Sequence, residues 1–304
     1  MKTKTLLSLL LPAALLPLHA SATDFGGPKN AQLQAQKAYT TGAGESETVS
    51  DAYIAEQRRN LAINTKGQGF GPQSPRNIDI KQGKNRVYFG TAPDSSRMNL
   101  CNIHFHKNAE HAGGEFTTYA GNGDGHGYQT GYKYDGHLSK RELTPSVEVC
   151  PSDHGGLKPG DTIEVHYVHS SAKVVPGASL GACLSDSISN PDFRVEAQVF
   201  VLVNDENAVD FTHHTQVSKR KGFYQAPRIP RWTGEPVVYA GSTTGPGYNE
   251  DGSPYQVTWS VRPKVVKVDI NTVGSWCEDN QFDEDHAHGV RNLVKNPHLL
   301  SKIK

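Results

Sequence analysis

Two histidines separated by one residue, His104 and His106 in the run NIHFH, could bind a metal ion. Side chains alternate between the two faces of a β-strand, so on a strand both imidazoles project from one face, about 7 Å apart. Ile103 and Phe105 would then project from the opposite face. Neutral imidazole is a common metal ligand, and two rings on one face suit a single ion. The pair alone fits two ordinary half-exposed histidines equally well, so a third ligand is needed.

The run DTIEVHYVHS supplies a candidate third ligand. On a strand, Glu164, His166 and Val168 share one face, while His169 belongs to the other. If this strand pairs beside the first, His166 completes three neutral nitrogen donors and leaves a fourth position open, the pattern of a catalytic zinc site. Glu164 could accept the N–H that is not used for the metal, which would fix the tautomer of the ring. The alternative is a cross-strand Glu–His pair without metal.

Strands are therefore the elements that must position these residues. Beyond Pro75, short β-branched or aromatic runs alternate with turn residues, without a long amphipathic helix between them. The 30 glycines and 18 prolines are scattered too regularly for a helical bundle. The sequence predicts a mainly antiparallel β domain with long loops. Those at 117–137 and 240–254 exceed what hairpins need, and loops of this length are often functional.

The first 22 residues have the features of a secretory signal peptide: two lysines, a short apolar run broken by prolines, and an Ala20-Ser21-Ala22 ending. The apolar run is too short to span a bilayer, so no membrane span is expected. Ser50 and Asp51 could cap a short helix that continues to about Asn64. We expect a signal peptide at 1–22, a flexible lead-in with this short helix at 23–69, and a catalytic domain at 70–304.

Charge and cysteine content narrow the class of protein further. The 31 basic and 31 acidic residues balance, so we expect a small-molecule substrate and no nucleic acid. In a periplasmic or secreted protein, paired cysteines are usually disulfides, and three pairings are open. The candidates are Cys101, Cys150, Cys183 and Cys277. Cys101 lies an odd number of positions before His104, so strand alternation predicts that its side chain points away from the histidine face.

The runs HFH, EH and EVHYVH together resemble the carbonic anhydrases of the alpha type, whose strands carry HxH and E-L-H-L-V-H. The short KNA spacer between His106 and Glu110 is more similar to the delta class. GPQSPRNIDI at 71–80 is similar to a QSP-I-N-I segment, and residues 239–261 are similar to GSLTTPP and a following V-T-W strand. The resemblance implies a mainly β fold with a large central, mostly antiparallel twisted sheet, long loops and a few short helices.

The resemblance also implies an activity, the reversible hydration of carbon dioxide to bicarbonate and a proton by metal-bound hydroxide. One Zn²⁺ per chain, replaceable by another divalent metal, would be held by His104, His106 and His166. Glu164 matches the residue that supports the third ligand, and His111 lies next to the site in sequence. His111 and His126 are also candidates for carrying the proton away. The resemblance does not indicate an oligomeric state.

Glu110 and Thr243 match a pair in which a threonine hydroxyl donates to the glutamate and so can only accept from the metal-bound hydroxide. The leucine of GSLTTPP is missing here, so the threonine is Thr243 or Thr244, and Thr243 is the preferred assignment. Val168 and Trp259 match positions that line a small apolar pocket for carbon dioxide.

Two other readings remain. His104, His106 and Glu110 also fit the H-x-H-x-x-x-E motif of cupins, in which the glutamate is itself a ligand. That reading leaves Glu164 and the QSP and TTGP stretches without a role. A non-catalytic module with a carbonic anhydrase fold is the other alternative, and the presence of all three histidines counts against it.

Overall fold

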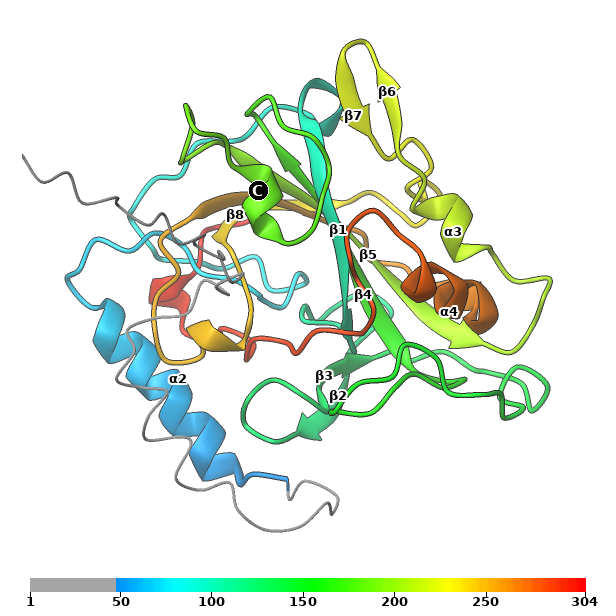
Figure 1. Cartoon of the computed structure of the whole chain (residues 1–304). Helices are drawn as coiled ribbons and strands as arrows, with labels where there is room; N and C mark the ends of the chain where they lie inside the picture. Colours follow the sequence, from blue (N-terminus) through cyan, green and yellow to red (C-terminus); the bar gives the residue numbers. More distant parts are fainter. Residues whose placement is uncertain (1–47) are drawn as a thin grey trace, which may run out of the picture.

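The computed structural model describes residues 48–304, so the expected signal peptide and most of the lead-in lie outside the described residues. A six-stranded sheet forms the centre, in the order β1-β4-β5-β9-β8, with β10 also paired to β5 (Figure 1). The pairs β1–β4, β4–β5 and β8–β9 are antiparallel, whereas β9 and β10 run parallel to β5. The prediction of a mainly β fold with a mostly antiparallel central sheet is therefore confirmed. The six strands are β1 Asn99–Lys107, β4 Thr162–Ser170, β5 Phe193–Val203, β8 Val237–Ser242, β9 Gln256–Val261 and β10 Val266–Asp269.

Two small hairpins and a few short helices complete the described part of the chain. The hairpins are β2 Thr118–Asn122 with β3 Thr130–Lys133, and β6 Ser218–Arg220 with β7 Phe223–Gln225. The α-helices are α2 Asp51–Thr65, α3 Phe211–His214 and α4 Ile270–Glu278, and the 3₁₀ turns are η2 Ser95–Arg97, η3 Leu180–Cys183, η4 Pro246–Tyr248 and η5 Pro297–Leu299. Among residues 48–304, no helix combines the length and the apolar character needed to cross a membrane.

The helix expected near residues 50 to 64 is present as α2. The Ser50 side chain caps it by accepting a hydrogen bond from the Tyr53 N–H at 3.2 Å. The Gln57 amide donates to the Gly125 carbonyl, and Leu61 is buried with Leu299 and neighbouring residues. This helix therefore packs against the rest of the described chain.

The sheet separates two apolar clusters, one on each face. Side chains alternate along β1, so neighbouring residues join different clusters. Ile103 and Phe105 pack with Trp276 of α4 on one face, and this is the face opposite the histidines, as the strand alternation predicts. Trp259 and Val168 belong to the cluster on the opposite face.

The prediction that Cys101 points away from the histidine face is wrong. A β-bulge between Leu100 and Asn102 interrupts the alternation, and Cys101 packs in the cluster that contains Val168 and Trp259. The structure also resolves the pairing of the four cysteines, which form two disulfides, Cys101–Cys183 and Cys150–Cys277. Two disulfides are typical of proteins in an oxidising compartment.

Candidate metal centre

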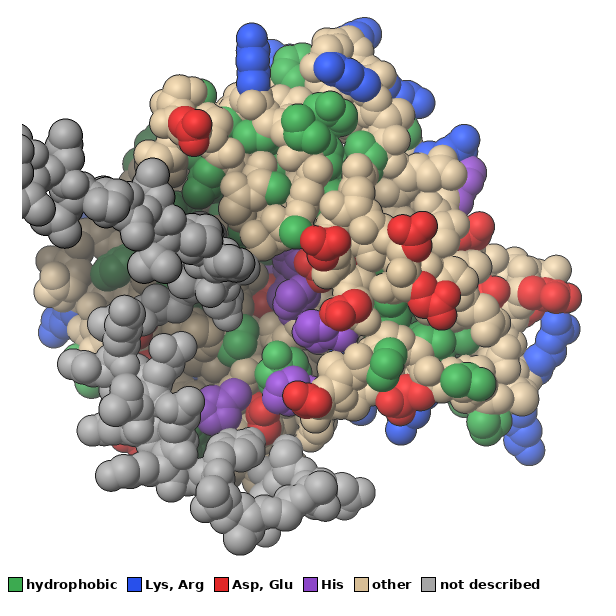
Figure 2. Space-filling view, viewed as in Figure 1, with side chains coloured by type: hydrophobic (Ala, Val, Ile, Leu, Met, Phe, Trp, Pro, Cys, Tyr) green, Lys and Arg blue, Asp and Glu red, His purple; other side chains and the backbone are tan. Residues whose placement is uncertain are grey.

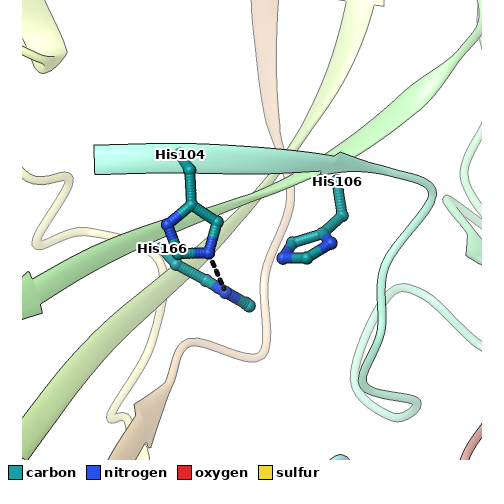
Figure 3. A group of neighbouring side chains, drawn as sticks. All are labelled: His104, His106 and His166. Atoms are coloured by element: carbon teal, nitrogen blue, oxygen red, sulfur yellow. Dashed lines mark hydrogen bonds between the residues drawn. The ribbon is translucent and has the colours of Figure 1, made fainter. Parts of the chain in front are cut away.

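Three histidine rings converge on the face of β1 and β4. The two strands pair with His104 opposite His166, so residues 62 positions apart in the sequence become neighbours. His106 lies two residues further along β1, on the same face. Each of the three rings offers one nitrogen, and these atoms all lie within 4.8 Å of one another (Figure 3). In the space-filling view, histidine side chains gather near the centre of the face, where the surface is hollowed (Figure 2).

Hydrogen bonds fix the tautomers of the first two rings. His104 Nδ1 lies 2.6 Å from the amide oxygen of Asn102, and His106 Nδ1 lies 3.0 Å from the backbone carbonyl of Gly289. Both partners are acceptors only, so Nδ1 of each ring carries the hydrogen. The Nε2 atoms of His104 and His106 are therefore left with lone pairs.

The third ring uses its other nitrogen. His166 Nε2 donates to Glu164 Oε1 at 3.0 Å, which leaves the lone pair on Nδ1. This Nδ1 faces His104 Nε2 at 3.3 Å (Figure 3). Two lone pairs at this distance repel each other unless a proton or a cation lies between them.

The donor set fits a zinc ion. Two nitrogen ligands of a tetrahedral Zn²⁺ at about 2.0–2.1 Å stand about 3.3 Å apart, the separation seen between the His104 and His166 nitrogens. His106 Nε2 is buried without a hydrogen-bond partner among the described residues, a cost that a metal would remove. Burial lowers the pKa of His106 to about 3 and also lowers the pKa values of His104 and His166. All three rings are neutral at pH 7, the state that binds a metal.

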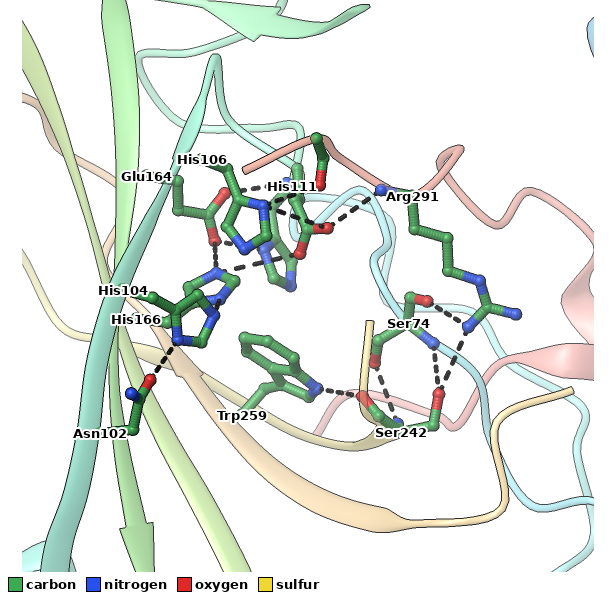
Figure 4. A network of polar contacts seen from close by, with 12 residues as sticks. Ser74, Asn102, His104, His106, His111, Glu164, His166, Ser242, Trp259 and Arg291 are labelled. Carbon is green, nitrogen blue, oxygen red and sulfur yellow. Dashed lines mark hydrogen bonds and ion pairs between the residues drawn. The ribbon is translucent and has the colours of Figure 1, made fainter. Parts of the chain in front are cut away.

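Behind His166, a buried network holds its carboxylate partner (Figure 4). Glu164 accepts from the backbone N–H of His111 at 3.0 Å, and its Oε1 lies 2.6 Å from His111 Nδ1. His111 Nε2 in turn lies 2.7 Å from the hydroxyl of Tyr239. Burial acts to raise the pKa of Glu164, but His111 and His166 together lower it well below its ordinary value. Glu164 is thus an ionised acceptor that orients His166.

His111, Glu164 and His166 also bring ligand atoms within 4.8 Å of one another. These atoms are hydrogen-bonded to each other, so the group is a support for His166 and offers no separate opening for an ion. His111 is fully buried between its two partners and does not reach solvent. His126 is exposed in the loop between β2 and β3.

Glu110 is buried beside the rings without joining the group of ligands. Its Oε1 accepts from the backbone N–H of Arg291 at 3.0 Å, while its two oxygens stay 3.9 Å from His106 Nδ1 and His166 Nε2, the nitrogens that donate to Gly289 and Glu164. Burial raises the pKa of Glu110, and His166 and the hydroxyl of Thr244 act to lower it. Glu110 Oε2 has no hydrogen-bond partner among the described residues, and Thr244 is the hydroxyl near enough to this carboxyl to lower its pKa.

The structure does not bring Thr243 to Glu110. The Thr243 hydroxyl is hydrogen-bonded to the Ser253 hydroxyl instead. It also acts to lower the pKa of Tyr248. Successive residues of an extended segment point in opposite directions, so only one of the two adjacent threonines can face the carboxyl. Thr244 is that residue.

The QSP segment holds the threonine loop in place. The Ser74 N–H donates to Ser242 Oγ, and the Ser242 N–H donates to Ser74 Oγ, both at 3.2 Å (Figure 4). The guanidinium of Arg291 donates to the Ser74 carbonyl at 2.6 Å and to Gln73 Oε1 at 3.2 Å. The sequence analysis identified both the QSP segment and the threonine loop, but it did not predict that they pack against each other.

Val168 and Trp259 lie in the same apolar cluster, beside the three histidine rings. Trp259 is 1% exposed, and its indole contacts the ring of His166 with centroids 5.0 Å apart. Its Nε1 donates to the Ser242 carbonyl at 2.9 Å, which fixes the indole against the threonine loop. The two residues give this side of the site an apolar wall.

Sequence reasoning missed several residues that surround the rings. Asn102 had a signal, because it lies two positions before His104 and alternation places both on one face. Gly289 and Arg291 had none, since they come from a C-terminal segment about 180 residues away. His288, which the sequence analysis did not single out, has its ring centroid 5.6 Å from that of His104 and 5.9 Å from that of His106. Its Nε2 lies 2.6 Å from Glu284 Oε2, and its side chain is 42% exposed.

Three of the solved structures that are similar to this chain are carbonic anhydrases. One is a hyperthermostable carbonic anhydrase from a hydrothermal vent chimney, with 13% identity and a TM-score of 0.27 over 74% of this chain and 85% of the other. The second is an alpha-carbonic anhydrase from Thermovibrio ammonificans in complex with sulfanilamide, with 15% identity and a TM-score of 0.28 over 84% of this chain and 97% of the other. The third is a carbonic anhydrase from Chlamydomonas reinhardtii in complex with acetazolamide, with 15% identity and a TM-score of 0.28 over 87% of this chain and 96% of the other. A search of curated proteins gives no match. The sequence profile of delta carbonic anhydrase matches residues 95–272, more than half of the chain. The chain belongs to the delta carbonic anhydrase family.

Proposed function

We propose that this protein is a zinc-dependent carbonic anhydrase, periplasmic or secreted, which reversibly hydrates carbon dioxide to bicarbonate and a proton. Family membership supports carbon dioxide hydration in general. The observation that carries the zinc assignment is the convergence of three neutral imidazoles, with two lone pairs facing each other at 3.3 Å. His104 and His106 would bind through Nε2, and His166 through Nδ1. When bound there, zinc lowers the pKa of water enough to supply a nucleophile at neutral pH; the general example of this effect is carbonic anhydrase itself.

Glu110 and Thr244 orient the nucleophile. An ionised Glu110 can only accept, so a Thr244 hydroxyl that donates its proton to Glu110 presents lone pairs on its other side. That hydroxyl then accepts a hydrogen bond from the attacking oxygen and aims its lone pair at the substrate. Of the two threonines considered, Thr244 takes this role because it faces Glu110 and Thr243 does not.

The apolar wall formed by Val168 and Trp259 would hold carbon dioxide. The molecule carries no net charge and has little need for hydrogen bonds, so it prefers an apolar surface next to the nucleophile. Because bicarbonate is charged, the same wall favours its release into water.

His288 is our candidate for the group that passes the proton from the centre to solvent. Its ring neighbours two of the metal-binding rings, is partly exposed, and is held through Nε2 by Glu284. We expect His288→Ala to lower turnover about a hundredfold in dilute buffer, because the proton would lack a positioned carrier. Rates measured across imidazole concentrations check this, since dissolved imidazole should restore turnover. An equal loss at every imidazole concentration would assign His288 a structural role instead.

Metal removal tests the proposed function as a whole. The chain without its first 22 residues is loaded with zinc, and carbon dioxide hydration is followed by the change in pH. Chelation should reduce the rate to that of the buffer, and an equimolar addition of zinc should restore it, because the nucleophile depends on the ion. Full activity in protein shown by elemental analysis to be metal-free would refute the proposal.

The cupin alternative gives Glu110 a different task. As a ligand, its carboxylate would approach the same ion as the histidine lone pairs, yet its oxygens lie 3.9 Å from the nitrogens on the opposite side of the rings. The family match is also to a carbonic anhydrase. We therefore treat Glu110 as a partner of Thr244.

A further inference from the structure

The irregular segment at residues 171–184, which follows β4, lies against β1 beside the metal-binding rings. A disulfide joins its end to the strand, Cys101–Cys183, and the Ser170 hydroxyl donates to the Cys183 carbonyl at 2.7 Å. In its middle, the Gly177 N–H donates to the Cys101 carbonyl at 3.0 Å. The segment is thus attached to β1 at the residue directly before Asn102.

Gly177 also holds the side chain of Asn102. The Asn102 amide nitrogen donates to the Gly177 carbonyl at 3.2 Å, while the amide oxygen lies 2.6 Å from His104 Nδ1. A carbonyl cannot donate, so Gly177 determines that the nitrogen of this amide faces the segment and the oxygen faces the imidazole. The oxygen in turn requires a hydrogen on His104 Nδ1 and leaves the lone pair on Nε2.

We propose that the 171–184 segment, held by the Cys101–Cys183 disulfide, is a positioning device that sets the tautomer and orientation of His104 for metal binding. The inference rests on the proposed zinc site. The β-bulge is what makes it geometrically possible, because it brings Cys101 to the same face as the rings. Outer contacts of this kind typically change metal affinity about 10- to 100-fold when they are removed.

The second disulfide provides a matched control. Cys150–Cys277 packs in the apolar cluster on the opposite face of the sheet, and it closes a loop of 127 residues compared with 82 for Cys101–Cys183. Stabilisation by a cross-link depends only weakly on loop length, so removal of either disulfide should destabilise the fold similarly. Only Cys101–Cys183 is connected to a metal ligand.

The experiment compares zinc affinity, by competition with a chelator, in Cys101→Ala/Cys183→Ala and Cys150→Ala/Cys277→Ala proteins. We expect the first pair to bind zinc about tenfold or more weakly, and the second to bind it as the unmodified protein does. In the metal-free protein, ¹⁵N NMR of the histidine rings should show His104 protonated on Nδ1, and a mixture of tautomers only in the first pair. Equal affinities in both pairs would overturn the inference.

Two further variants cover the case in which the first pair does not fold. Gly177→Pro removes the N–H that attaches the segment to Cys101 and leaves both disulfides intact, so it too should weaken zinc binding. In an Asn102→Ala background, Gly177→Pro should cause no additional loss, because the route to His104 is already broken. Additive losses would contradict the inference. If the unmodified protein itself binds no zinc, the proposed function fails, and this outcome is distinct from all the others.

Discussion

Replacement of His166 by alanine is expected to abolish carbon dioxide hydration by removing zinc. Zinc sites with four protein ligands bind with about 10–16 kcal/mol, so one ligand accounts for roughly 3 kcal/mol, or about a hundredfold in affinity. The loss should be larger here, because Glu164, a buried ionised carboxylate, would lose a hydrogen-bond donor as well. Elemental analysis after dialysis, together with the hydration rate, checks this expectation.

The control for this variant is His298→Ala, which removes an exposed histidine from η5. It should retain both zinc and rate. His104→Ala removes a ligand that is only partly buried, and it should also lose zinc and rate, with a smaller effect on folding. A His166→Ala protein with full activity would show that the ligand assignment is wrong.

Replacement of Thr244 by alanine should separate metal binding from catalysis. We expect zinc to remain, since no ligand is touched, and kcat/KM to fall about 10²-fold or more, the typical cost of losing one positioned hydrogen-bonding group at a reacting oxygen. Thr243→Ala should retain most of the rate, because the Thr243 hydroxyl is hydrogen-bonded to Ser253 and does not face Glu110. Steady-state kinetics of the two zinc-loaded variants decide between the adjacent threonines.

The direction of the proposed hydrogen bond from Thr244 to Glu110 can be tested by changing Glu110. Glu110→Gln replaces an acceptor with a group that can also donate, so Thr244 is no longer forced to donate toward position 110. Its rate should fall as in Thr244→Ala, and the double variant should lose no more than either single one, because both break the same contact. Independent, multiplicative losses would mean that the two residues act separately.

Local alternation made much of the fold and the metal centre predictable. On β1 and β4, every second residue faces the same way, so the sequence alone placed His104 and His106 together and Ile103 and Phe105 opposite them. It also placed Glu164 beside His166. These statements depend on neighbours within one strand, and the strand geometry is the same wherever the strand packs.

The same reasoning failed where the local geometry changes. Strand alternation could not foresee the β-bulge that turns Cys101 onto the histidine face. The leucine of GSLTTPP is missing from this stretch, which leaves Thr243 and Thr244 as candidates, and the preferred one, Thr243, does not face Glu110. An ungapped comparison of GSTTGP with GSLTTP puts Thr243 at the leucine and Thr244 at the first threonine, in agreement with the structure.

By itself, the sequence determined the β class, the candidate ligands and their faces, since these depend on the residues of each strand. Only the tertiary structure decided which nitrogen each ring presents, because that choice depends on acceptors brought from elsewhere. Gly289 reaches His106 from 183 positions away, and Arg291 reaches Glu110 from 181. Such partners are backbone groups or common side chains whose identity carries no signal. They are selected by the packing of the whole chain, which also decided that Cys101 pairs with Cys183 and so attaches the 171–184 segment beside His104.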